Sequence, residues 1–202
     1  MTLAEALLVA VGAVAAIAAV GAWWAARSSS QASAAMTAIE RRRWHADLTP
    51  QFELACRVAS GERATLRVAL VGPAALDRLD RVTVRIRDDI PGRAPVTPGG
   101  PTAEEIARQV WGPYRFVPGV DGADQTGRSV APFGLLLGDW RPLALERTPA
   151  PTWSSDATAW QRQYNDQPVR LTLACVREGD EPWTVPQEVR VDQGAPPSAP
   201  GS

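Results

Sequence analysis

The uncharged segment Ala6–Ala26 constrains this chain more than any other feature, because it runs for 21 residues without an acidic or basic side chain. As a helix it would be about 31 Å long, close to the roughly 30 Å hydrocarbon thickness of a bilayer. Two tryptophans stand near its end, where an aromatic belt forms at a membrane surface, and residues 2–5 fit a capping box at its start. The segment predicts one membrane-spanning helix over residues 3–26.

Two alternatives for this segment stay open. Ten of its 21 residues are Ala, which is only marginally apolar, so a soluble Ala-rich helix is one alternative. A cleaved signal peptide is the other, with Ala32–Ala34 similar to a cleavage site. However, no Lys or Arg precedes the segment, and its apolar run exceeds the about 7 to 15 residues typical of signal peptides. A membrane anchor fits the segment best.

The positive charges indicate how the anchor is oriented. None precedes the segment, whereas Arg27 and the run Arg41, Arg42, Arg43 follow it. Loops rich in Arg tend to stay on the cytoplasmic side, so we expect a single-pass protein of the cell membrane with a cytoplasmic C-terminal domain. The arginine run is also a candidate interaction surface for anionic lipid heads or an acidic partner. The simpler interpretation is a topology signal on a solvated helix.

Small residues within the predicted span are candidates for helix association. Gly12 and Ala16 are four residues apart, a spacing that lets two membrane helices approach closely. A homo-oligomer held by this face would follow. In a segment this rich in Ala, the same spacing also arises by chance.

After residue 50 the hydrophobic pattern changes to alternation with period two, which is typical of half-buried strands. Roughly 150 residues follow residue 50, enough for one domain with a core. We expect a juxtamembrane helical linker over 27–49, a domain over 50–191 and a disordered tail over 192–202. The alternating segments of the domain are 51–58, 66–70, 82–86, 169–175 and 183–191.

Shorter segments fill the middle of the domain. Strands are expected over 114–117, 129–132 and 142–145, and short helices over 103–110 and 155–164. Many short strands with frequent Gly and Pro favour an antiparallel β-sandwich. The predicted fold class is mainly β: an N-terminal transmembrane helix, then an antiparallel sandwich with one or two short helices.

The two cysteines follow the same dipeptide, Leu-Ala, and both should point into the core. One Cys in an early strand and one in a late strand resembles the bridge between the sheets of immunoglobulin domains, so the sandwich is immunoglobulin-like in outline. The spacing between the two is longer than in a typical immunoglobulin domain. In a cytoplasmic domain we expect two free buried thiols, whereas an exported domain would carry a disulfide between Cys56 and Cys175.

More broadly, the arrangement resembles uncharacterised single-pass membrane proteins of GC-rich bacteria, which combine a short anchor, an arginine run and a strand-rich soluble domain. All 21 basic residues are Arg, which agrees with a GC-rich genome. The resemblance spans most of the chain and includes the phrase Leu-Gly-Asp-Trp-Arg-Pro at 137–142. It brings no known activity or site.

The chain lacks the residues that most catalytic and metal sites need. It has no Lys, and His45 is its only His, which argues against phosphate-loop lysines, Schiff bases and His-rich metal sites. The sequence Asp-Gln-Thr-Gly at 124–127 is only superficially similar to an aspartic protease motif, and Asp121 and Asp124 lack the spacing of a calcium loop. We expect no catalytic residue, cofactor or metal ion. With a net charge of −1, nucleic acid is not an expected partner.

Charged residues of the third predicted strand are further candidates for an interaction surface. Arg81, Arg85 and Arg87 share its outward face and could bind an acidic partner through paired hydrogen bonds, although a plain solvated face is the simpler interpretation. Asp88 and Asp89 are adjacent, so in a strand they would face opposite sides without sharing a proton. We expect both to be solvated.

The predicted function is a membrane-anchored, non-enzymatic β-sandwich module for protein interaction at the cytoplasmic face. One alternative is a structural or assembly subunit of a membrane complex that associates through its helix. Another is an exported, disulfide-bonded domain. The expected partners are the lipid bilayer, an unidentified protein and, in the assembly alternative, a second copy of the chain.

Overall fold

The computed structural model describes residues 24, 36–37, 39–90 and 100–192, and the chain divides into two units, residues 1–47 and 48–202. Apart from Trp24, the predicted anchor lies outside the described residues, and so do Gly12 and Ala16. None of the described helices is both long and apolar enough to cross a bilayer. The anchor and its association face stay predictions, because their residues are not described.

In the first unit, residues 36–37 and 39–47 are helical. Arg41, Arg42 and Arg43 are exposed on this helix. Successive residues of an α-helix lie about 100° apart around its axis. The three guanidinium groups therefore fan out over the helix surface and do not form one face.

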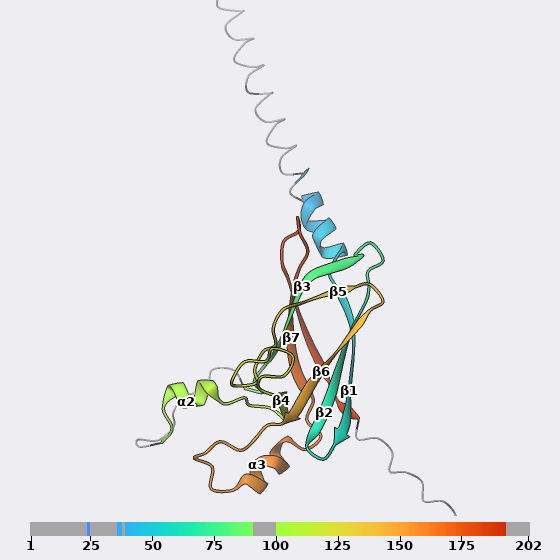
Figure 1. The fold of residues 1–202 in the computed structure, drawn as a ribbon. Helices are drawn as coiled ribbons and strands as arrows, with labels where there is room; N and C mark the ends of the chain where they lie inside the picture. Colours follow the sequence, from blue (N-terminus) through green and yellow to red (C-terminus); the bar gives the residue numbers. More distant parts are fainter. Residues whose placement is uncertain (1–23, 25–35, 38, 91–99, 193–202) are drawn as a thin grey trace, which may run out of the picture. The chain divides into compact units, whose positions relative to one another are not determined.

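The second unit is built from two β-sheets, with short helices beside them (Figure 1). Among the described strands, every pair is antiparallel except the short pair of β1 and β9. The predicted mainly β fold with two antiparallel sheets and few helices is thus confirmed. The first sheet has the order β4-β6-β2-β1-β9, with β1 Gln51–Ser60, β2 Arg63–Gly72, β4 Tyr114–Phe116, β6 Trp140–Arg147 and β9 Val191–Asp192. The second has the order β5-β3-β7-β8, with β3 Arg78–Ile86, β5 Phe133–Leu136, β7 Val169–Val176 and β8 Trp183–Val189.

The core lies between the sheets because alternate residues of each strand point inward. On β2, Leu66, Val68 and Leu70 are fully buried. Leu171 and Leu173 of β7 are equally buried and belong to the same hydrophobic cluster. Burying one such side chain contributes about 1.5 to 3 kcal/mol. This shared cluster holds the two sheets together. Its members on β2 and β7 recur at every second position, as the alternation in the sequence predicts.

One predicted strand is wrong. Residues 129–132 form no strand: Ser129 makes a single isolated bridge with Arg85, and the edge strand β5 begins at Phe133. Arg128 and Val130 on either side of Ser129 each make one backbone hydrogen bond with β3. Pro132, the next residue in that alternation, has no N–H with which to continue the ladder. In contrast, β6 is longer than the predicted 142–145, since it pairs with β2 along nearly its whole length.

The two helices of the second unit, α2 Ala103–Arg108 and α3 Ala157–Tyr164, occupy the predicted segments and lie at the same end of the sheets (Figure 1). Thr102 caps α2 with a capping box: its hydroxyl accepts from the N–H of Glu105, and the Glu105 carboxylate accepts from the N–H of Thr102. Asp156 caps α3. Both helices thus start at local signals in the sequence, and α3 carries two buried aromatic side chains, Trp160 and Tyr164.

Candidate functional site

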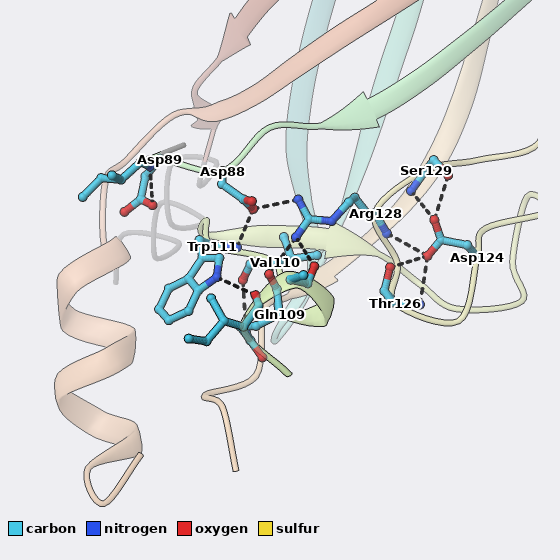
Figure 2. Close-up of polar contacts among 12 residues, drawn as sticks. Asp88, Asp89, Gln109, Val110, Trp111, Asp124, Thr126, Arg128 and Ser129 are labelled. Carbon is cyan, nitrogen blue, oxygen red and sulfur yellow. Dashed lines mark hydrogen bonds and ion pairs between the residues drawn. The ribbon is translucent and has the colours of Figure 1, made fainter. Parts of the chain in front are cut away.

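A polar cluster at this end of the sheets is centred on Arg128 and Asp88 (Figure 2). Arg128 Nη1 lies 2.8 Å from Asp88 Oδ1, and Nη2 donates to the carbonyl oxygen of Gln109 at 2.7 Å. The two charged side chains are only 12% and 26% exposed. Charge-assisted hydrogen bonds in a partly buried setting are strong. The pair therefore ties the exit of β3 to the segment after α2 and to the loop at 124–129.

Aromatic side chains pack beside the ion pair. Trp111 donates its backbone N–H to Asp88 Oδ1 at 3.0 Å and its indole N–H to the carbonyl of Ile106 at 3.1 Å. The Trp111 ring lies 5.3 Å from that of Trp160, which lies 4.9 Å from the ring of Tyr164. These tilted contacts join the segment after α2 to α3.

Asp89 has other partners than its neighbour. Its Oδ2 accepts from the hydroxyl of Tyr164 at 3.0 Å, and its Oδ1 accepts from the N–H of Ile90 at 2.7 Å. Asp88 and Asp89 thus diverge, as expected. The expectation that both are solvated is wrong, because both lie just beyond β3, where partly buried segments supply donors to them. The oxygens of the two carboxyl groups are engaged by different partners.

Asp124 organises the loop that carries Arg128. Its carboxylate accepts from the backbone N–H groups of Thr126, Arg128 and Ser129 and from the hydroxyl groups of Thr126 and Ser129 (Figure 2). Partial desolvation raises the pKa of this carboxyl, but those hydrogen bonds outweigh it and hold the pKa well below its usual range. A carboxylate that stays ionised and engaged in this way does not fit the proton-sharing role of an aspartic protease residue.

The same loop approaches the backbone of β4 closely. Gly127 has a φ of +72°, and a Cβ at this position would lie 2.2 Å from the carbonyl oxygen of Phe116. Only glycine fits such an approach. Asp121, the other residue of the calcium hypothesis, accepts from the N–H of Ala144 at 2.8 Å. Across the part of the chain that the structure describes, no group of three or more acidic, Cys or His side chains is placed to hold a metal ion.

Arg81 and Arg85 are exposed on the outward face of β3, Arg87 is exposed directly after its end, and we call these three residues the basic face. They differ in their surroundings. Arg87 lies 3.9 Å from Glu188, which Arg170 also approaches at 3.3 Å. Arg81 and Arg85 have no carboxylate partner among the described residues.

Uncharged residues lie next to these two arginines on β3 and across the ladder to β7. Thr83 stands between them on β3, and the residues paired with Thr83 and Arg85 across the ladder are Ala174 and Thr172 of β7. None of these side chains carries a charge. Neither Arg81 nor Arg85 thus faces a charged residue directly across the ladder to β7, whereas the next outward residue, Arg87, lies beside Glu188.

A groove of about 630 Å³ lies beside β5, where the edges of the two sheets adjoin. Its wall includes Leu136 and Trp140, which are 56% and 52% exposed, and side chains of both charges such as Asp80 and Arg141. The Arg67 guanidinium lies 4.9 Å from the centre of the Trp140 ring. Because the groove carries both signs of charge, it favours neither an acidic nor a basic ligand.

Cys56 on β1 and Cys175 on β7 are free, buried thiols in opposite sheets. Burial raises the pKa of Cys56 to about 11 and that of Cys175 to about 12. Both are protonated at neutral pH, so neither is a strong nucleophile. Their role is in packing.

The polar cluster centred on Arg128 and Asp88, which we call the end cluster, could not be predicted from the sequence. Arg128 is one of 21 arginines, and only the pattern Asp-Gln-Thr-Gly-Arg-Ser at 124–129, rich in turn-forming residues, marks its loop. Comparison of the chain with protein-family models, curated proteins and solved structures finds no match in any of the three. The functional inference therefore rests on the surfaces of the domain, in particular on the basic face.

Proposed function

We propose that this protein is a membrane-anchored, non-enzymatic module that binds an acidic segment of a partner protein on its basic face, at the cytoplasmic side of the cell membrane. The observation that carries the proposal is the pair Arg81 and Arg85, exposed on one face of β3 with no carboxylate partner in the described residues. Each guanidinium offers a planar fork of donors that matches a carboxylate. Four residues apart on a strand, the two lie about 13 Å apart along the backbone. That spacing suits an extended acidic peptide.

Glu188 supports the kind of contact that we propose. It accepts ion pairs from Arg87 and Arg170 on the same outward side of the second sheet. An acidic side chain can therefore lie flat on this sheet between two guanidinium groups. A partner carboxylate near Arg85 would make the same kind of contact.

The predicted anchor over 3–26 would hold the basic face at the membrane surface. Confinement to a membrane surface raises the effective concentration of the domain toward a partner on the same membrane. The exposed run Arg41–Arg43 follows the anchor and supports a position near anionic lipid heads, where each such charge contributes about 1 kcal/mol. Both features act together with the basic face and do not replace it.

The strand order supports a finer fold proposal, an immunoglobulin-like sandwich. In the first sheet, β1, β2, β6 and β4 correspond to strands A, B, E and D. In the second sheet, β5, β3, β7 and β8 correspond to strands C′, C, F and G. The neighbours within each sheet then agree with the immunoglobulin pattern. Two features differ. β4 precedes β5 in the chain, and Cys56 lies on β1 in place of the second strand. The second difference favours two free thiols over the usual bridge.

The test is binding of a fluorescent peptide of alternating Glu and Thr to the full chain in lipid nanodiscs. Arg81→Gln with Arg85→Gln should raise the dissociation constant at least about tenfold, because two charge-assisted contacts are lost. The matched control is Arg57→Gln with Arg63→Gln, which removes the same charge from the outward side of the first sheet. It should leave affinity within about twofold.

Two results would contradict the proposal. Failure of the wild-type chain to bind the acidic peptide would remove the basis of the proposal. Equal loss of affinity in both double variants would mean that net charge, and not the basic face, decides binding. The proposed location has its own test. A reporter enzyme fused after Ser202 that is active only outside the cytoplasm would overturn the cytoplasmic orientation.

A further inference from the structure

A second, more enclosed cavity lies beside β4 and the end of α3. Its volume is about 270 Å³, and its wall includes Tyr114, Arg147, Tyr164, Asp166, Gln167 and Arg190. Small polar ligands fit a space of this size, whereas a folded partner does not enter it. The cavity is separate from the basic face, because the two share no residue.

The cavity carries more positive than negative charge. Arg147 and Arg190 both line it, and Asp166 is the single acidic residue in its wall. In the described part of the chain neither guanidinium forms an ion pair with a carboxylate. Arg147 lies 5.5 Å from the centre of the Tyr114 ring and donates to Asn165 Oδ1 at 3.3 Å. These contacts position Arg147 and leave its charge unneutralised.

Tyr114 adds an unused hydrogen-bond donor. The residue is 4% exposed, yet its hydroxyl has no hydrogen-bond partner among the described residues. Within the same residues, Thr148 Oγ1 is the single fully enclosed side-chain atom without a partner, so the Tyr114 hydroxyl still reaches solvent. Tyr114 is one of the residues that line the cavity. Desolvation raises the pKa of Tyr114, which keeps the phenol neutral and able to donate.

We infer that this cavity binds the anionic group of a small ligand, a carboxylate or a phosphate, through Arg147, Arg190 and the hydroxyl of Tyr114. Two guanidinium groups supply charge-assisted hydrogen bonds, and the phenol supplies a third, neutral donor. The aromatic ring beneath Arg147 limits the rotation of its side chain, so less entropy is lost on binding. The inference goes beyond the proposed protein interaction and does not depend on it.

The experiment uses the full chain in nanodiscs with ¹⁵N-labelled arginine. Inorganic phosphate and, separately, succinate are titrated against sodium chloride at equal ionic strength while the side-chain Nε–Hε signals are recorded. We expect saturable shifts of the Arg147 and Arg190 signals with at least one of the two anions and no such shift of Arg57. Saturation by phosphate alone assigns a phosphate group, and saturation by succinate alone assigns a carboxylate.

Variants connect the shifts to the cavity. Arg190→Gln should weaken binding at least about tenfold, and Tyr114→Phe, which keeps the ring beneath Arg147, should weaken it about threefold to tenfold. The control Arg57→Gln should change nothing. The inference is overturned if neither anion gives saturation beyond that of chloride. It is equally overturned if Arg190→Gln and Arg57→Gln weaken binding alike. Tryptophan fluorescence checks that each variant is folded.

Discussion

Arg128 and Asp88 are 40 positions apart in the sequence, yet their side chains form an ion pair of 2.8 Å that is largely shielded from solvent. The same guanidinium also donates to the carbonyl groups of Ala107 in α2 and of Gln109 directly after it. Three stretches of chain that lie outside the strands are thereby held together. This contact joins the connections at this end of the domain to one another.

Replacing Arg128 with Met should lower the free energy of unfolding by about 2 to 3 kcal/mol. The change leaves the Asp88 carboxylate without its counter-charge and removes the donor to the Gln109 carbonyl. The control is Arg108→Met, which breaks the pair of Arg108 and Glu104, whose side chains are 67% and 74% exposed. That change should cost less than about 0.5 kcal/mol. Urea unfolding followed by tryptophan fluorescence measures both, and equal losses would contradict the structural role of Arg128.

Asp124 should make the domain sensitive to acid. Its pKa is depressed in the folded state by the loop hydrogen bonds, so its contribution to stability is fully present above the unfolded-state pKa of about 3.9. The contribution is lost as the pH falls through that value toward the lower folded-state pKa. Asp124→Asn should therefore be less stable than the wild type at about pH 6, with the difference shrinking toward about pH 3. Unfolding curves at several pH values test this, and a constant difference would refute it.

The cysteines should be inert in the folded chain. Because burial raises the pKa of Cys56 to about 11 and that of Cys175 to about 12, the reactive thiolate is scarce at about pH 7.5. Modification by a maleimide should be at least about 100-fold slower in the folded chain than in urea. No reductant should be needed in urea. A requirement for reductant would instead indicate a disulfide and an exported domain.

Thr148 offers a stabilising change. Its residue is 4% exposed, and its Oγ1 has no hydrogen-bond partner among the described atoms. Thr148→Val replaces the hydroxyl with a methyl group of the same shape and should raise the free energy of unfolding by about 1 kcal/mol. Thr148→Ser keeps the hydroxyl, loses the methyl group and should lower it by about 1 kcal/mol. Thermal unfolding of the three proteins decides, and a less stable Val variant would mean that the hydroxyl binds a buried water.

The sheets could be predicted because burial leaves a local record in the sequence. Val169, Leu171 and Leu173 recur at every second position, and each is fully buried on β7. The outward position of Arg81 and Arg85 follows from the same alternation. Any strand with one wet and one dry face carries this pattern.

The end cluster and the cavity could not be predicted, because they depend on contacts between distant segments. Tyr164 and Asp89 are 75 positions apart, and nothing local to either residue names the other. β5 was missed for a different reason. It is an edge strand of four residues with Gly134 inside it, so its alternation is too short to recognise.

The parallel pair of β1 and β9 has a consequence for synthesis of the chain. β1 can pair with β2 as soon as this hairpin has emerged from the ribosome. The other edge of β1 can pair with Val191 and Asp192 only after every other strand has been synthesised. During that interval the N–H and C=O groups along this edge are an open template for strands of neighbouring chains. Nascent copies on one polysome can therefore cross-pair at β1, and β9 later covers this edge only beside Cys56 and Arg57.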